Sequence, residues 1–340
     1  MSSATVVRRS NLLHTPSYFR SILRRFPDVE FAFAYGSGVY GQRSYDLNST
    51  GRKPTIDVVM AVRDARAWHA RNLLEHPEHY AQPLRTMGAS SVAKVQRMGA
   101  GVYYHPIVTI EEGQELKYGV VEVDVLSRDL KEWNTLFCAG RLQKPTFVMK
   151  ETQELEVARK QNYASAVAVS VLLLPETFSA LDLFLTVTGL SYSGDPRFDF
   201  GAENRDKVSN IVEANMSGFV DLYENVVADC PWIDGPSLRA DDPRSPNLVR
   251  SATLIDATDR FLEDVPLALR ATVGDANRMR RLIESSDITE VIRGALASVV
   301  RRHAPAQYAK GILSAGLSKS VTYVRSKLSK GVLSHGRKKN

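Results

Sequence analysis

The chain has few cysteines and lacks a long apolar run. Only Cys138 and Cys230 occur among its 340 residues, and they share no C-x-x-C spacing. We therefore expect neither a disulfide framework nor a cysteine zinc site, and a reducing compartment fits this usage. The longest apolar stretch, residues 164–174, contains two serines. It is far shorter than the roughly 20 residues that span a bilayer, so any membrane contact is expected at the surface.

Acidic residues are absent from both ends. Residues 1–27 hold five arginines, and residues 291–340 hold eleven lysines or arginines, without any acid. All 38 acids fall in residues 28–290, which therefore carry a net negative charge. Nucleic acid is not expected as a partner, because a phosphate backbone requires a basic face. Residues 1–16 have the composition of a short mitochondrial targeting segment, and the alternative is an ordinary basic first helix.

Two short apolar runs surround a glycine turn. Residues 29–34 and 56–62 read as buried strands, and Tyr35-Gly36-Ser37-Gly38 follows the first of them. Glycines there let backbone N–H groups approach a phosphate, and Ser37 adds a donor. Asp57 on the second strand is suited to hold Mg²⁺ against the same triphosphate. This predicts nucleotidyl transfer, and the alternative is a plain tight turn beside a capping aspartate.

The sequence resembles the mitochondrial phosphatidate cytidylyltransferase family, also described as translocator assembly and maintenance proteins. The matching stretches run in order along nearly the whole chain: YGSGVY (35–40), AWHARNLLEHPEHY (67–80), GAGVYYHP (99–106), KYGVVEVDVL (117–126), AGRLQKP (139–145), LLLPETFSALDLF (172–184), GLSYSGDPR (189–197) and AKGILSAG (309–316). The resemblance implies an Mg²⁺-dependent enzyme that converts CTP and phosphatidic acid to CDP-diacylglycerol and pyrophosphate, feeding cardiolipin synthesis. It also implies a peripheral location on the matrix side of the mitochondrial inner membrane.

The resemblance implies a polymerase-β-like nucleotidyltransferase domain, but one feature departs from that pattern. Such domains carry two acids on the second strand, whereas the position two after Asp57 is Val59. Glu122 and Asp124 lie two apart on an expected strand over residues 118–126 and so face the same side. We expect Asp124, or failing that Glu122, to complete the metal site with Asp57. The alternative is that both acids face solvent on an edge strand.

Other positions are expected to contact substrate. A helix capped by Ser127 and ending at Gly140 precedes Arg141 and Lys144, which we expect to bind phosphate; the alternative is that they only complement the helix dipole. The resemblance also marks His69, Asn72 and Lys117 as substrate-cleft candidates, with structural hydrogen bonding as the alternative for the first two. His76 and His79 flank a proline, and because no cysteine or acid was seen to complete a tetrahedral set, zinc is not expected there.

From Thr152 onward the sequence becomes helical. Helices beginning near Thr152 and Ser179, followed by Gly189 and Gly194, suggest a winged-helix-like domain that closes over the nucleotide. Its cleft residues would be Ser191, Tyr192, Ser193 and Arg197, and a plain Gly-Pro turn is the alternative. Residues 229–250 read as an irregular surface loop.

The last segment has the pattern of a basic amphipathic helix that lies on an anionic membrane surface. The alternative is a helix packed on its own domain. The residues expected at the membrane are Leu317, Val321, Val324, Arg325 and Leu328. The predicted fold class is α/β of the α+β kind. Its expected parts are a possible targeting segment (1–16), a nucleotidyltransferase domain with a mixed sheet (17–151), the helical domain (152–300) and the membrane-surface segment (301–340).

Two other functions stay open at this point. One is a nucleotidyltransferase with a soluble or RNA acceptor, and the other is a non-enzymatic factor that maintains protein import at the inner membrane. No residue identifies cytosine, an acyl-chain preference or an oligomeric state.

Overall fold

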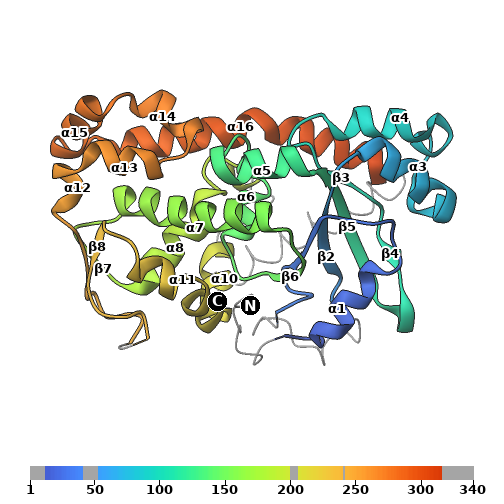
Figure 1. The fold of residues 1–340 in the computed structure, drawn as a ribbon, viewed down its shortest axis with the longest axis horizontal. Helices are drawn as coiled ribbons and strands as arrows, with labels where there is room; N and C mark the ends of the chain where they lie inside the picture. Colours follow the sequence, from blue (N-terminus) through green and yellow to red (C-terminus); the bar gives the residue numbers. More distant parts are fainter. Residues whose placement is uncertain (1–11, 41–52, 200–205, 240–241, 316–340) are drawn as a thin grey trace, which may run out of the picture.

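The computed structural model describes residues 12–40, 53–199, 206–239 and 242–315. Figure 1 shows a sheet with its covering helices on one side and a mainly helical part on the other, with one long helix, α16 (Ile288–Ala315), running along both. The predicted α+β class with a mixed sheet is confirmed.

The main sheet has six strands in the order β3-β5-β2-β1-β6, with β4 also paired to β5. Its strands are β1 (Phe31–Tyr35), β2 (Ile56–Val62), β3 (Tyr103–Tyr104), β4 (Val108–Thr109), β5 (Glu115–Glu122) and β6 (Phe147–Lys150). β2 and β5 are parallel, whereas β1 runs antiparallel to both β2 and β6. The sheet therefore brings the two predicted strands side by side in the register Tyr35 to Asp57.

The two faces of the sheet pack against different cores. Phe33, Val59 and Val121 point toward the helical part, whereas Ala34, Val58 and Tyr118 point to the opposite side. This is the alternation expected of strands covered on both faces. Asp57 and Val59 are two residues apart on β2, so their side chains lie on the same face of the sheet. That face is the one directed toward the helical part.

Two of the helical segments around the sheet begin at a residue whose side chain caps them. The segments around the sheet are α1 (Pro16–Leu23), α3 (Ala65–Glu75), η2 (Pro77–His79), α4 (Leu84–Gln96), η3 (Glu111–Gly113), α5 (Val123–Glu132) and α6 (Ala139–Leu142). Thr15 caps α1 through a hydrogen bond from the Tyr18 N–H. Asp64 accepts from the Ala67 N–H at 2.9 Å, as its position before α3 predicts.

Two predicted boundaries are wrong. The strand expected over residues 118–126 ends at Glu122, and α5 begins at Val123, so Ser127 lies inside the helix and does not cap it. The helix ends at Glu132 and is followed by Trp133, which adopts a left-handed conformation, and Gly140 falls in the separate short helix α6. A valine-rich run is compatible with a strand or with a helix. The packing of α5 on the sheet determines the residue at which the strand ends and the helix begins.

The helical part is built around α7 (Gln153–Leu173), whose second half, from Asn162 onward, is buried on nearly all sides. Its other elements are α8 (Ala180–Leu190), α9 (Pro196–Asp199), α10 (Lys207–Ala214), α11 (Met216–Ala228), α12 (Thr253–Asp256), α13 (Thr258–Asp264), α14 (Leu267–Val273) and α15 (Ala276–Glu284). Ser179 and Asp182 form the two reciprocal hydrogen bonds of a capping box at the start of α8. The starts predicted at Thr152 and Ser179 are thus confirmed.

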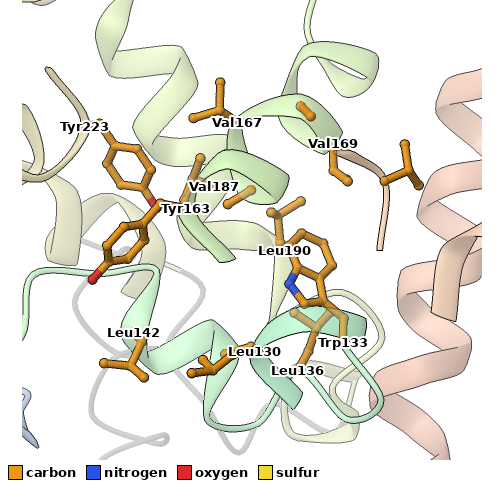
Figure 2. Packing of buried hydrophobic residues seen from close by; sticks show 14 of the residues in the cluster. Leu130, Trp133, Leu136, Leu142, Tyr163, Val167, Val169, Val187, Leu190 and Tyr223 are labelled. Carbon is orange, nitrogen blue, oxygen red and sulfur yellow. The ribbon is translucent and has the colours of Figure 1, made fainter. Parts of the chain in front are cut away.

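One core joins the two parts. Figure 2 shows Trp133, directly after α5, next to Leu190 of α8, and these two belong to the same buried cluster as Leu130 of α5 and Val169 of α7. The same buried cluster extends from Phe33 in the sheet to the far helices. The indole of Trp133 also donates to Asn162 at 2.8 Å. The predicted boundary at residue 151 therefore separates two layers of secondary structure but not two hydrophobic cores.

A second, three-stranded antiparallel sheet lies at the edge of the helical part, in the order β7-β9-β8. Its strands are β7 (Thr177–Phe178), β8 (Ile233–Asp234) and β9 (Leu248–Arg250). Residues 229–250 are thus not wholly irregular, since both β8 and β9 fall within them. These strands are too short for their alternation to be recognised in the sequence.

The long helix α16 crosses the predicted boundary at residue 300 without a break. Gln307 exchanges hydrogen bonds with the backbone of Ala100 and Val102, and Lys310 donates to the carbonyls of Gln96 and Met98. Residues 301–315 are therefore part of the folded body. The expected membrane residues Leu317 to Leu328 lie outside the described residues. Within the described ranges, no helix has both the length and the apolar character needed to cross a bilayer.

Candidate active site

The glycine turn after β1 lies against the carboxylate of Asp57. Gly36 has φ +80°, a conformation that other residues adopt only at a cost, and a Cβ added there would lie 3.7 Å from Asp57 Oδ2. A side chain at Gly38 would collide with the carbonyl oxygen of Thr55. Gly36 is thus required by turn geometry and Gly38 by close packing on β2. Ser37 is half-buried between them.

Three side chains gather around Asp57 on one face of the sheet. Tyr35 is its partner on β1, and Lys117 is its partner on β5. Tyr104 of β3 lies one strand further, with its hydroxyl 2.9 Å from that of Tyr35 and its ring 4.9 Å from Lys117 Nζ. Burial raises the pKa of Tyr35 well above its ordinary value, so the hydroxyl stays protonated and available as a donor. The predicted residues Tyr35, Asp57 and Lys117 are brought together here.

Arg141 approaches the same group from α6. The buried carboxylate of Asp129 accepts four hydrogen bonds, from Thr135 and from the N–H groups of Cys138 and Ala139, which fixes the loop before α6. The Arg141 guanidinium then lies 3.7 Å from the Phe137 ring centroid and 5.4 Å from that of Tyr35. Its buried Nε has no hydrogen-bond partner among the described residues. A buried donor without a partner favours an anionic ligand.

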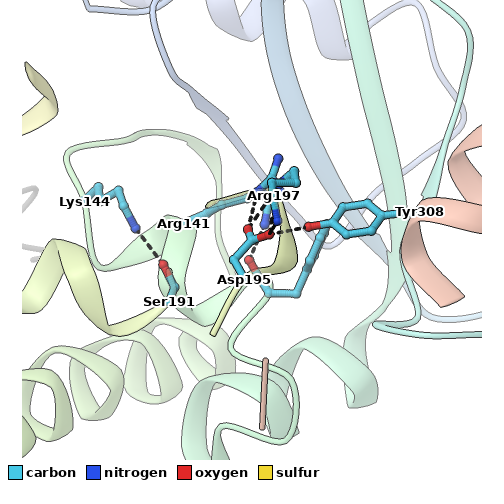
Figure 3. A network of polar contacts seen from close by, with 7 residues as sticks. Arg141, Lys144, Ser191, Asp195, Arg197 and Tyr308 are labelled. Atoms are coloured by element: carbon cyan, nitrogen blue, oxygen red, sulfur yellow. Dashed lines mark hydrogen bonds and ion pairs between the residues drawn. The ribbon is translucent and has the colours of Figure 1, made fainter. Parts of the chain in front are cut away.

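Lys144 lies beside this cation. Its ammonium donates to the Gly140 carbonyl and, at 3.1 Å, to Ser191 Oγ (Figure 3). Tyr192 separates it from Lys207, with ring distances of 5.1 Å to Lys144 and 5.3 Å to Lys207. Burial, and then the charges of Arg141 and Lys207, lower the pKa of Lys144 to about 7. Three cations this close in a half-buried site repel one another, and a bound polyanion would relieve that repulsion.

The loop that carries Ser191 is tied to α16. Asp195 is buried, forms an ion pair with Arg197 and accepts a 2.8 Å hydrogen bond from the Tyr308 hydroxyl (Figure 3). Burial opposes ionisation of Asp195, but the hydrogen bonds and charge of Arg197 outweigh it and lower its pKa. Ser193 donates weakly to the Gly189 carbonyl at 3.4 Å. Ser191 and Tyr192 thus reach the cations, whereas Asp195 and Arg197 hold the loop in place.

The expected pairing of Asp57 with Asp124 is not present. Asp124 is exposed in the first turn of α5, where its charge complements the helix dipole. Asp57 is paired with Lys117, whereas Glu122 lies five residues further along β5, which is roughly 16 Å at the rise of a strand. Glu122 accepts from the Ala65 N–H at the start of α3. The prediction failed because it placed Asp124 on a strand that ends two residues earlier.

His69 and Asn72 are also away from this cluster. Both are fully buried on the opposite side of the sheet, where they share a network with Tyr80 and Tyr118. His69 additionally contacts Gln96 at 2.8 Å, and burial lowers its pKa to about 4. The structural alternative therefore holds for these two residues, and their place among cleft residues is corrected.

Sequence reasoning missed two members of the cluster. Tyr104 was included in the matching stretch 99–106 without a role, and Lys207 follows a region for which no motif was recognised. A tyrosine on an edge strand and a lysine at the start of a helix are common features. Only the fold places them against Lys117 and Tyr192.

Asp57 is compatible with an Mg²⁺ site that substrate completes. Mg²⁺ is commonly held by one or two carboxylates together with phosphate oxygens and water. The half-buried Asp57 offers one such carboxylate beside the Gly36 turn, and the nearby cations would hold the phosphates. The donor set therefore fits the ion.

The strand carboxylate, the glycine turn and the nearby cations together make a candidate polyanion site in an α+β protein with a mixed sheet. Residues 19–330 match the family model described as phosphatidate cytidylyltransferase, mitochondrial. Proteins of that name from Danio rerio and Drosophila melanogaster are each 38% identical, over 94% and 90% of this chain and 96% of their own. The Dictyostelium discoideum protein of that name is 32% identical over 93% of this chain and 84% of its own. The chain belongs to the mitochondrial phosphatidate cytidylyltransferase family.

Proposed function

We propose that the chain is a phosphatidate cytidylyltransferase that forms CDP-diacylglycerol and pyrophosphate from CTP and phosphatidic acid. A phosphate oxygen of phosphatidate attacks the α-phosphorus of CTP, and the bond from that phosphorus to the β-phosphate oxygen breaks. The observation that carries the proposal is the half-buried group of Arg141, Lys144 and Lys207, in which Arg141 lies 5.4 Å from the ring of Tyr35, the register partner of Asp57. Family membership supports the choice of substrates.

Some residues of the site would position the substrates, and others would neutralise their charge. Gly36, Ser37 and Gly38 would approach the triphosphate with backbone and hydroxyl donors, and Lys117 and Arg141 would neutralise its charge. Lys144 would take up its proton when a phosphate binds beside it. Phosphatidate is already ionised, so no general base is required, and positioning with charge neutralisation supplies most of the catalysis.

Asp57 would hold Mg²⁺, whose charge would offset the negative charge that develops on the leaving pyrophosphate. Lys117 is adjacent to Asp57 in register. Its ammonium would add positive charge for the phosphates on the same face of the sheet. The main sheet corresponds in this proposal to a polymerase-β-like nucleotidyltransferase domain, and α7, α8 and the small sheet to its winged-helix-like companion.

The lipid substrate requires a membrane surface. We assign that contact to residues 316–340, whose sequence pattern includes Leu317, Val321, Val324, Arg325 and Leu328. The absence of acids there favours anionic lipid, to which each basic residue contributes on the order of 1 kcal/mol. This accords with a peripheral enzyme on the matrix side of the mitochondrial inner membrane whose product feeds cardiolipin synthesis.

The test is transfer of label from α-labelled CTP to lipid on liposomes that contain phosphatidate, with release of pyrophosphate measured in parallel. We expect equal amounts of lipid label and pyrophosphate, dependent on Mg²⁺, with CTP preferred over ATP, GTP and UTP. Folded protein that transfers no label from any of the four nucleotides would refute the enzyme and favour the maintenance factor. Transfer to a soluble acceptor or RNA but not to phosphatidate would refute the lipid substrate.

A further inference from the structure

A group of potential metal ligands lies on the other side of the sheet from Asp57. His76, Glu78 and His79 surround Pro77 at the turn η2, and one ligand atom from each lies within 4.8 Å of the other two. Glu78 Oε1 is 3.5 Å from both His76 Nδ1 and His79 Nε2. Among the residues that the structure describes, no other trio of His, Cys, Asp or Glu converges in this way. No cysteine or acid was expected to contribute to a ligand set with these histidines, but Glu78 supplies a third ligand atom.

In each imidazole, the ring nitrogen that does not face Glu78 forms a hydrogen bond. His76 Nε2 donates to the carbonyl of Arg25 at 2.8 Å, which leaves the lone pair on Nδ1, the atom that faces Glu78. His79 Nδ1 lies 2.8 Å from the hydroxyl of Tyr118, and that oxygen also accepts from Asn72 Nδ2 at 3.1 Å. Tyr118 has a second lone pair, so it can accept from the His79 Nδ1–H, and in that tautomer Nε2 is free to bind a metal. Metal-binding histidines are commonly oriented by such hydrogen bonds on their other nitrogen.

Neighbouring side chains pack against the two imidazole rings, but the side of the group that Glu78 occupies is open to solvent. The imidazoles are stacked, with centroids 4.6 Å apart and planes 8° apart, and Phe26 lies against both. His79 is buried, whereas Glu78 is exposed. Ligands around a tetrahedral ion lie about 3.4 Å from one another when each bond is about 2.1 Å long. A rotation of the exposed Glu78 and the half-buried His76 would close the present separation, and an ion can enter from solvent.

We propose that His76, Glu78 and His79 form a site for a divalent transition metal of the zinc class, separate from the Mg²⁺ site proposed at Asp57. Two imidazoles and one carboxylate favour zinc and its neighbours over Mg²⁺, which prefers oxygen. Three protein ligands leave a position for water. Through Arg25, η2 and Tyr118 the ion would connect the end of the first helical segment to β5. Its role is to fasten this edge of the fold.

The test uses the full chain without a histidine tag, stripped of metal by a chelator. Zinc affinity and stoichiometry are measured by calorimetry, and Co²⁺ is used as a visible probe of coordination number. The variants are His76→Gln and Glu78→Gln, and the control is Glu75→Gln. Glu75 is an exposed acid nearby that pairs with Arg71. Metal-free circular dichroism verifies that each variant is folded.

We expect one zinc per chain, a four-coordinate Co²⁺ spectrum, and binding that a large excess of Mg²⁺ does not displace. Affinity should fall at least tenfold in His76→Gln and in Glu78→Gln and stay unchanged in Glu75→Gln. Zinc should raise the melting temperature of the unaltered chain and of Glu75→Gln only. Equal affinity in all four proteins, or no binding at millimolar zinc, would overturn the proposal. These measurements do not depend on transferase activity, so they test the zinc site even if the proposed function is refuted.

Discussion

Asp57 on β2 and Lys117 on β5 occupy paired positions on adjacent parallel strands, so a carboxylate and an ammonium share one face of the sheet. Asp57 lies beside the Gly36 turn and opposite Tyr35 on β1, and Lys117 lies against the ring of Tyr104. It replaces the pair of acids that the sequence led us to expect. A lysine at this place supplies charge for the phosphates that a second carboxylate would repel.

Replacing Asp57 by Asn should abolish transfer while leaving the fold intact. The amide keeps the shape of the carboxylate but loses the charge that binds Mg²⁺, and we expect a loss of at least about 100-fold in kcat. Asp124→Asn is the matched control, because this exposed residue lies on α5. Its activity should stay within about twofold. Comparable losses in both variants would restore Asp124 to the metal site.

Lys144 should produce a decline in activity above neutral pH. Its pKa is lowered to about 7 by burial and by the charges of Arg141 and Lys207, so the free enzyme loses this cation as pH rises past that value. We expect kcat/KM at constant saturating Mg²⁺ to fall above a pKa of about 7. Lys144→Arg keeps its charge over this range and should flatten the decline. An unchanged profile in the arginine variant would assign the titration to another group.

Asp129 should be among the residues most important for stability. It is buried and accepts four hydrogen bonds, so Asp129→Ala leaves several donors unsatisfied and should lower the free energy of unfolding by about 3 kcal/mol or more. Asp64→Ala is the comparison, because Asp64 caps α3 through one exposed bond and should cost about 1 kcal/mol. Urea unfolding measures both. A smaller loss for Asp129→Ala than for Asp64→Ala would contradict this account.

Lys310 should make stability rise with pH above neutrality. Burial lowers its pKa to about 7, whereas an unfolded lysine titrates near 10.4. Between these values the unfolded chain binds more protons than the folded one, so the free energy of unfolding increases with pH and this increment is lost as pH falls toward 7. In Lys310→Met the rise between pH 7 and 9 should be shallower. The variant should also be less stable overall, because two carbonyls at the end of α4 lose their donor.

A chain that ends at Ala315 should separate membrane contact from the fold. It keeps α16, including Gln307 and Lys310, and removes the predicted membrane residues. We expect a melting temperature within a few degrees of the full chain, with loss of sedimentation on anionic liposomes and of most lipid labelling. As a control, both chains should bind CTP equally. Retained liposome binding would place the lipid contact elsewhere.

Local patterns predicted most of the elements but only part of the site. β2 was predicted to the residue, and the start of α8 at Ser179 was identified correctly because capping depends on neighbours three residues away. Asp124 was misplaced because Val-Glu-Val-Asp-Val alternates like a strand, and the chain turns into α5 only when Val123 and Leu126 pack on the core. Glu78 was overlooked because η2 is a single turn. Contacts such as Tyr104 with Lys117 depend on strand order, which no local pattern specifies.

The anchoring of α16 also constrains how the protein can be made. Gln307 and Lys310 bond to backbone groups more than 200 positions earlier in the chain. The outer edge of the main sheet near β3 therefore stays incomplete during synthesis until the carboxy-terminal region emerges. Closing so long a loop is slow, which leaves the amino-terminal half waiting with unsatisfied carbonyls. A nascent chain that stalls before residue 307 would be a client for chaperones rather than an enzyme.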